Sequence, residues 1–178
     1  MDGGFPKGTL ILVFGSPLAG LEWMARQFWE AEEGNRGAYL ILDDEPGPGM
    51  TDAGEVPPGS LPALFSGSRI VIDSISSLLQ RSDLNVTLEC IHVLKKDIKS
   101  RGANAMMTLY SGVHTPVEET RIMRAADVVI ELRVVILQNM IERQVVIYKI
   151  RDSAVPGRVV PFIITDKGIE LSTTSRVV

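Results

Sequence analysis

A turn framed by two glycines constrains this chain more than any other stretch of its sequence. An apolar run at 9–14 leads into the turn, and a stretch with helical spacing follows it. Between a strand and a helix, the pattern G-x-x-x-x-G-K-[ST] marks a loop that binds phosphate. This chain keeps both glycines, but a leucine and a glutamate stand at the Lys and Ser/Thr positions. The residues of this glycine-framed turn are Gly15, Ser16, Pro17, Leu18, Ala19, Gly20, Leu21 and Glu22.

The two departures from the pattern act in the same electrostatic direction. Leu21 removes a positive charge and Glu22 adds a negative one. Two unit charges about 4 Å apart interact by roughly 4 kcal/mol at an effective dielectric of about 20. Even after screening, a polyphosphate would bind this turn on the order of a hundredfold to many thousandfold more weakly. We therefore predict a degenerate phosphate-binding loop, and the alternative is an ordinary strand-to-helix turn.

Short apolar runs alternate with amphipathic stretches along much of the chain. This alternation predicts an α/β fold with a twisted, mostly parallel sheet and helices on both faces. After residue 127 the helical stretches stop, which predicts an antiparallel C-terminal extension. The predicted strands are 9–15, 38–43, 69–75, 105–110, 127–135, 143–151 and 159–171, and the predicted helices are 20–33, 83–101 and 116–126.

The segment 46–62 differs from its surroundings in composition. It holds half of the chain's 10 prolines, together with several glycines. Proline lacks an amide donor, so such a segment cannot propagate a helix or join the interior of a sheet. We predict a mobile surface loop within a single domain that spans 1–178, because neither flanking part alone carries enough strands for a sheet.

Carboxylates follow two of the predicted strands. Asp73 ends the apolar run Ile70-Val71-Ile72, and Asp43-Asp44-Glu45 closes the strand at 38–43. An acid at the carboxyl end of a buried parallel strand is placed where phosphate-binding proteins hold Mg²⁺, and a neighbouring carboxylate can polarise an attacking water. The alternative is that both groups are solvated strand ends.

Two cations stand at alternate positions near the end of a late strand. Lys149 and Arg151 would point to the same face of the segment 143–151. We expect them to reach a phosphate across a subunit interface. The alternative is an exposed basic edge that discourages strand pairing.

Composition narrows the classes of function. The net charge of −4 argues against a surface built mainly to hold nucleic acid. The single cysteine, Cys90, excludes an internal disulfide framework. The sequence has neither an uninterrupted apolar stretch of membrane-spanning length nor a basic-then-apolar start typical of secretion. We expect a cytoplasmic protein with no membrane partner.

Several segments, taken in order, resemble the KaiC-like branch of the RecA-type P-loop ATPases. The match extends over nearly the whole chain, and its most specific part is the tail. The segments are G-G-F-P-K-G-T at 3–9, L-I-L-D-D-E-P at 40–46, R-I-V-I-D-S-I-S-S-L-L at 69–79, A-D-V-V-I-E-L at 126–132, and Y-K-I-R-D-S at 148–153 followed by P-F-I-I-T-D-K-G-I-E at 161–170.

The resemblance implies a RecA-like fold and roles for the residues that match its motifs. Asp73 would be the Walker B acid for Mg²⁺, and Asp44 and Glu45 would occupy the catalytic position that activates water, here vestigial. In that family the Lys and Arg of the tail reach the nucleotide of the neighbouring subunit. Lys149 and Arg151 would form this trans-acting finger.

Together, the resemblance and the degenerate turn predict a pseudo-ATPase. We expect a KaiC-like domain that has lost tight ATP–Mg²⁺ binding and acts as a regulatory or oligomeric interaction module. Whether it is an enzyme stays open, and any activity would be ATP hydrolysis. Its partner would be further copies of itself or an active KaiC-like relative. The alternative is an active or weakly active ATPase, with Asp73, Asp44 and Glu45 still holding Mg²⁺ and water. DNA binding is less favoured, because no basic, aromatic-rich loop is present.

Overall fold

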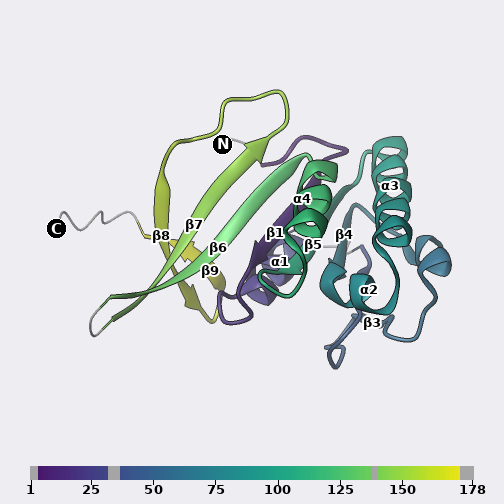
Figure 1. The fold of residues 1–178 in the computed structure, drawn as a ribbon, viewed down its shortest axis with the longest axis horizontal. Helices are drawn as coiled ribbons and strands as arrows, with labels where there is room; N and C mark the ends of the chain where they lie inside the picture. Colours follow the sequence, from purple (N-terminus) through teal and green to yellow (C-terminus); the bar gives the residue numbers. More distant parts are fainter. Residues whose placement is uncertain (1–3, 32–36, 138–139, 173–178) are drawn as a thin grey trace.

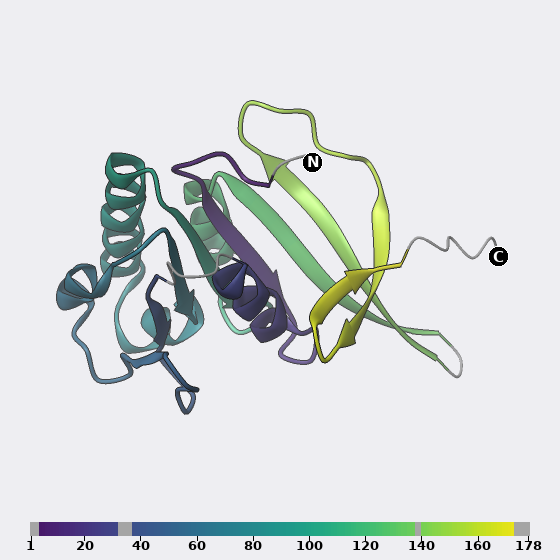
Figure 2. The same ribbon diagram turned by 180° about the vertical axis from the view of Figure 1, so that it is seen from behind.

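A sheet with the strand order β3-β2-β4-β5-β1-β6-β7-β8-β9 organises the part of the chain that the structure describes (Figures 1 and 2). The computed structural model describes residues 4–31, 37–137 and 140–172. The strands are β1 (Leu10–Gly15), β2 (Tyr39–Ile41), β3 (Thr51–Asp52), β4 (Arg69–Asp73), β5 (Asn104–Tyr110), β6 (Val128–Leu137), β7 (Met140–Ile150), β8 (Val159–Thr165) and β9 (Gly168–Leu171). The helices are α1 (Leu21–Glu30), α2 (Ile75–Arg81), α3 (Leu84–Arg101), α4 (Pro116–Ala125) and the 3-10 helix η1 (Pro58–Leu64).

The half of the sheet from β3 to β6 is parallel throughout. Every residue of the central strand β1 is buried. The register places Leu12 beside Met107 of β5 and Val129 of β6. A continuous apolar run suits a strand whose two faces are both covered. The α/β fold with a mostly parallel sheet, predicted from the alternation of strands and helices, is therefore confirmed.

The antiparallel C-terminal extension is also confirmed, although its last part differs from the prediction. Strands β7, β8 and β9 pair antiparallel in succession. The segment 159–171, expected as one strand, is two strands joined at Asp166 and Lys167. The Lys167 amide donates to Thr165 Oγ1 over 3.2 Å, and Gly168 has a φ of 112°, which favours glycine. The split and the unexpected strand β3 bring the described sheet to 9 strands instead of seven.

Helices cover both faces of the sheet, as predicted. Figure 1 shows α3 and α4 on the near face, and Figure 2 shows α1 on the opposite face, near β9. On the α1 side, Phe162 of β8 and Ile169 of β9 join the core around Phe28 and Trp29. The side-chain amide of Gln27 bonds both the backbone N–H of Ile169, over 2.9 Å, and its carbonyl, over 3.3 Å. The C-terminal extension is thereby fixed against α1.

Local capping explains where the helices on the other face begin and end. The carboxylate of Asp83 accepts hydrogen bonds from the first free amides of α3, and Gly102 ends that helix with a φ of 68°. Thr115 and Glu118 form a capping box at the start of α4. Both helices match the predicted ranges to within a residue.

Helix α2 was not predicted. It is 7 residues long and begins directly after β4, with the Ser77 amide donating to Ser74 Oγ over 3.3 Å. A helix of two turns is too short to show a repeated apolar period, so it could not be told from the strand that precedes it. Helix α1 ends at Glu30, earlier than the predicted 33, and residues 32–36 lie outside the described part.

The segment 46–62, predicted as a mobile surface loop, lies mostly at the surface but contains more regular structure than expected. The segment contributes strand β3 to the sheet edge and most of the 3-10 helix η1. Ala53 and Leu61 are fully buried in the core on the α3 side. The Arg81 guanidinium donates to the carbonyls of Ala53 and Gly54. Two buried apolar side chains and one cation therefore hold this segment in place. Its prolines keep it out of the sheet interior, but they allow a short edge strand and a 3-10 helix.

Within the described residues, no helix is both long enough and apolar enough to span a membrane.

The core on the α3 side should be sensitive to the loss of single side chains. Ile91 of α3 is 0% exposed, and Ile91→Ala should lower the free energy of unfolding by about 2–5 kcal/mol, because it leaves a cavity. Val93, on the same helix, is 40% exposed, and Val93→Ala should change it by no more than about 0.5 kcal/mol. Urea denaturation of both variants measures the difference, and equal values would contradict the packing described above.

Candidate functional site

The glycine-framed turn lies between β1 and α1, as its sequence context predicted. The two glycines are required for different reasons. A Cβ at Gly15 would lie 2.2 Å from the Leu132 carbonyl oxygen of β6, so packing against the backbone excludes a side chain there. Gly20 has a φ of 93°, which favours glycine whatever the space around it. Neither reason involves a phosphate.

The two residues that depart from the phosphate-binding pattern have opposite environments. Leu21 is buried in the core around α1, whereas the Glu22 side chain borders a cleft. Partial burial raises the pKa of Glu22, a hydrogen bond from its own amide lowers it, Asp73 raises it further, and Arg143 opposes that change. Glu22 thus brings negative charge to the first turn of α1, where a phosphate-binding helix would receive its anion.

Beside the turn lies a cleft of about 490 Å³, here called the acidic cleft. It opens at the carboxyl ends of β1, β2, β4 and β5, where parallel strands bring their final residues to one edge of the sheet. Arg26 is the one basic residue among those that line it. Its carboxylates are Glu22, Asp43, Asp44, Glu45 and Asp73.

Asp73 is the most enclosed of these carboxylates. Its two oxygens accept hydrogen bonds from the Tyr39 hydroxyl, over 2.8 Å, and the Thr108 hydroxyl, over 2.6 Å. Burial raises the pKa of Asp73, these two hydrogen bonds oppose the rise, and the charges of Asp43 and Asp44 add to it. Burial and the adjacent Asp73 also raise the pKa of Tyr39 far above its ordinary value. The cleft therefore disfavours additional negative charge.

The three acids that follow β2 do not share one role. Asp43 accepts hydrogen bonds from the hydroxyls of Ser74 and Ser77, which ties the end of β2 to the start of α2. Asp44 and Glu45 are exposed, and the Asp44 carboxylate accepts the amide of Glu45 over 2.7 Å. Asp44 and Glu45, the predicted catalytic pair, border the same cleft as Asp73. The sequence placed these acids beside the same site.

Glu22 stands where a phosphate-binding loop has the hydroxyl that contacts Mg²⁺. Each oxygen of Asp73 accepts one hydrogen bond from a buried hydroxyl and keeps a further acceptor site. Among the described residues, no three His, Cys, Asp or Glu side chains gather closely enough to hold a metal ion.

Sequence reasoning missed Tyr39 and Thr108. Each lies on a buried strand and points inward, where an apolar residue is the usual occupant. The available signal was the hydroxyl itself, since a buried hydroxyl needs a hydrogen-bonding partner. The partner, Asp73, lies on a different strand from both, so the sheet order was needed to find it.

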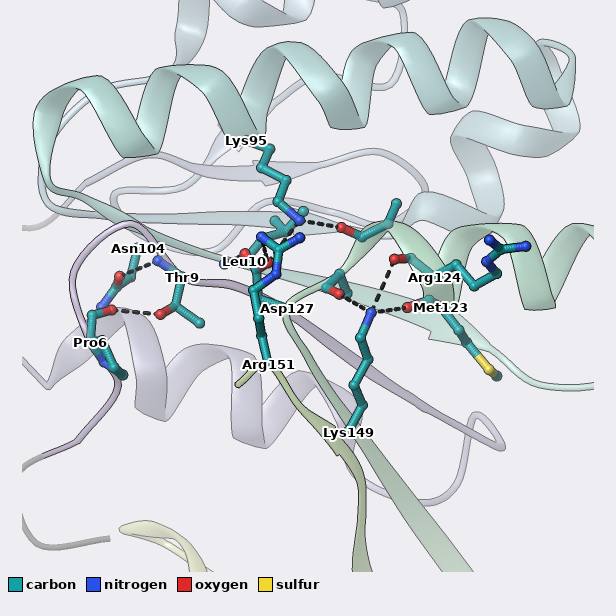
Figure 3. Close-up of polar contacts among 12 residues, drawn as sticks. Pro6, Thr9, Leu10, Lys95, Asn104, Met123, Arg124, Asp127, Lys149 and Arg151 are labelled. Carbon is teal, nitrogen blue, oxygen red and sulfur yellow. Dashed lines mark hydrogen bonds and ion pairs between the residues drawn. The ribbon is translucent and has the colours of Figure 1, made fainter. Parts of the chain in front are cut away.

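Lys149 and Arg151 lie near the start of β1, whereas the acidic cleft lies at its end. Figure 3 shows both cations beside Asp127 and the last turn of α4. Lys149 Nζ donates to the carbonyls of Arg124, over 3.0 Å, and Ala126, over 2.5 Å. Arg151 lies just past β7, so the predicted strand 143–151 is one residue too long there. Neither cation lines the acidic cleft of its own chain.

Asp127 is the centre of this arrangement, here called the Asp127 cluster. Its carboxylate pairs with Lys95 Nζ at 2.8 Å and Arg151 at 2.7 Å, and it accepts the Leu10 amide over 3.1 Å (Figure 3). Burial alone would raise the pKa of Asp127, but the Lys95 and Leu10 hydrogen bonds and the charges of Lys95 and Arg151 hold it below its ordinary value. Burial, with Lys95 nearby, lowers the pKa of Lys149.

The sheet order, the strand–turn–helix at the end of β1 and the acid at the end of β4 define a RecA-like ATPase fold. The family model described as "ATPase: KaiC" matches residues 63–176, which is more than half of the chain. The chain therefore belongs to the KaiC ATPase family. The matched segment includes Asp73, Asp127, Lys149 and Arg151, and it begins after the glycine-framed turn.

A solved structure supports the same fold. The crystal structure of the KaiC-like protein PH0186 from the hyperthermophilic archaeon Pyrococcus horikoshii OT3 aligns with a TM-score of 0.69. The alignment covers 96% of this chain and 92% of that chain, with 21% sequence identity. No curated protein matches this chain.

The charge on Asp73 should destabilise the folded protein at neutral pH. Because the folded-state pKa of Asp73 is raised, ionisation costs stability above that pKa, and the cost disappears as pH falls below the ordinary value of about 4. Asp73→Asn should therefore raise the melting temperature at pH 7 by about 2–4 °C. The gain should shrink toward pH 4 in thermal scans.

Asp166→Asn provides the control, because Asp166 lies exposed in the turn between β8 and β9. It should leave the melting temperature nearly unchanged across the same pH range. A lower melting temperature for Asp73→Asn at every pH would mean that its hydrogen bonds outweigh the cost of its buried charge.

Proposed function

We propose that this KaiC-family domain does not hold ATP–Mg²⁺ tightly and acts through contacts with other proteins, as a regulatory or oligomeric interaction module. The observation that carries the proposal is the charge of the acidic cleft. A triphosphate seated against the turn would meet the carboxylates of Glu22, Asp44, Glu45 and Asp73, with Arg26 as the one cation lining the cleft.

The size of this repulsion supports the proposal. At an effective dielectric of about 20, one carboxylate about 4 Å from a phosphate charge costs roughly 4 kcal/mol before screening. Burial raises the pKa of both Glu22 and Asp73, and neighbouring carboxylates add to the rise, so further negative charge in the cleft is unfavourable. Among the described residues, no lysine lines the acidic cleft, and Lys149 lies near the other end of β1.

The position of Lys149 and Arg151 suits a role toward another subunit. The Arg151 side chain is 51% exposed, although it pairs with Asp127. The partner would be a second copy of this chain or an active KaiC-like relative, whose phosphate Arg151 could approach in trans. Asp127 and the carbonyls at the end of α4 would hold both cations in place before such a contact forms.

One observation favours the alternative, a weak ATPase or a nucleotide-dependent switch. Asp73, Asp44 and Glu45 all border the same cleft beside the glycine-framed turn. These carboxylates would act on a nucleotide only if the Mg²⁺ that accompanies the nucleotide offset the combined negative charge of the cleft. Phosphate release above background that is abolished by Asp73→Ala would support this alternative.

Calorimetric titration with ATP and Mg²⁺ tests the main proposal. The unaltered chain should bind with an affinity weaker than micromolar. Glu22→Gln should strengthen binding by about tenfold, because it removes a charge worth on the order of 1.4 kcal/mol or more after screening. Glu30→Gln, an identical change at the opposite end of α1, should have no effect.

A micromolar or tighter affinity for the unaltered chain would overturn the proposal. Equal effects of Glu22→Gln and Glu30→Gln would show that the weak binding does not come from the charge at the start of α1.

A further inference from the structure

A hollow of about 500 Å³ lies against helix α1 and is separate from the acidic cleft. It is here called the α1 hollow. Arg69 and Asn104, the first residues of β4 and β5, line it, whereas the acidic cleft lies where the parallel strands end. None of the described residues lines both spaces. The volume falls within the roughly 300–1,000 Å³ of small-molecule sites, so the α1 hollow is large enough to bind a ligand of its own.

The walls of the α1 hollow are mostly apolar and come from several parts of the chain. Two of them are methionine side chains, which are unbranched and adapt to a flexible ligand. Leu171 is 59% exposed, so the hollow opens to solvent beside β9. The apolar wall residues include Phe5 before β1, Met24 and Phe28 of α1, Met106 of β5, and Ile169 and Leu171 of β9.

Hydrogen bonds hold these walls in place. On one side, the two bonds from the Gln27 amide to the backbone of Ile169 fix β9 against α1. On the other side, Asn104 Oδ1 accepts the Thr9 amide over 2.9 Å, and the Thr9 hydroxyl donates to the Pro6 carbonyl over 2.6 Å (Figure 3). These bonds fix the segment before β1 against the start of β5. The α1 hollow is therefore formed before any ligand enters it.

One cation marks one side of the hollow. Arg69 is the only charged side chain among the described residues that line it. Its guanidinium donates to the Phe28 carbonyl over 2.9 Å and lies 5.1 Å from the centroid of the Phe28 ring. Arg69 thereby offsets the negative end of α1, which would otherwise repel an anion. A ligand that complements this hollow is apolar along its length and carries one negative charge at the end that meets Arg69.

We propose that the α1 hollow binds a small alkyl carboxylate, with the alkyl chain against Met24, Met106 and Leu171 and the carboxylate paired with Arg69. The planar guanidinium suits a carboxylate better than a neutral or cationic head group. This site goes beyond the proposed function and does not depend on it, because the acidic cleft and the α1 hollow share no described residue.

Calorimetric titration of the full chain with octanoate, without nucleotide, tests the site. The unaltered chain should bind one octanoate per molecule. Octylammonium has an alkyl chain of the same length but the opposite charge, and it should bind at least about tenfold more weakly, because Arg69 repels it.

A matched pair of variants in the C-terminal extension locates the ligand. Leu171→Asp should weaken octanoate binding at least about tenfold, because it removes an apolar wall and adds a like charge. Ile163→Asp makes the same kind of change on the adjacent strand β8, at a side chain that is 55% exposed and does not line the hollow, and it should leave the affinity unchanged. Circular dichroism melting shows whether both variants are folded.

Arg69→Gln tests the role of the charge. It should reduce the preference for octanoate over octylammonium to less than about threefold, because the remaining walls are neutral. Arg69 also bonds the Phe28 carbonyl, so the variant is first checked by circular dichroism melting. If Arg69→Gln does not fold, the comparison of Leu171→Asp with Ile163→Asp still decides the proposal.

Three results would overturn the inference: an unaltered chain that shows no saturable octanoate binding, equal affinities for octanoate and octylammonium, or octanoate binding that Leu171→Asp leaves unchanged. The last result would place the ligand elsewhere on the molecule. Tight binding of ATP and Mg²⁺ would contradict the proposed function but would leave this site in place, so the two failures are distinguishable.

Discussion

The buried carboxylate of Asp127 connects three parts of this fold. It accepts the amide of Leu10 at the start of the central strand, pairs with Lys95 of α3, and pairs with Arg151 just beyond β7. Removing one partner from a buried ion pair typically costs about 3–5 kcal/mol, because a charge is left without compensation. One side chain thereby fixes the parallel half, a covering helix and the antiparallel extension relative to one another.

The same geometry separates the two charged regions of the molecule. Parallel strands deliver their final residues to one edge, so Asp73, Asp44 and Glu45 meet there with Glu22. The antiparallel strand β7 runs the other way, so Lys149 and Arg151 arrive near the start of β1. A chain with a net charge of only −4 therefore has one acidic and one basic region at different ends of its sheet.

Sequence patterns predicted the candidate site in outline but not its internal pairing. The local features of the site could be predicted because each follows closely on a predicted strand. They are the two glycines of the turn, the charge of Glu22 and the acid Asp73. The hydrogen bonds from Tyr39 and Thr108 to Asp73 join three strands that are distant in sequence. Nor did the pattern of prolines at 46–62 reveal that Ala53 and Leu61 are buried, because packing overrides a weak local preference.

The sequence alone determined the α/β alternation, the antiparallel end and the family resemblance. It also shows Leu21 and Glu22 where the phosphate-binding pattern has Lys and Ser/Thr. Each of these features depends on neighbouring residues or short periods. Tertiary structure decided which charges meet. In the folded chain, Asp73 is buried between two hydroxyls, Asp43 accepts a hydrogen bond from Ser74 at the start of α2, and Arg151 pairs with Asp127. The physical reason is that electrostatic interactions depend on distance and burial. The order of strands in the sheet sets the distance and the burial of each charge, and that order cannot be read from the order of residues.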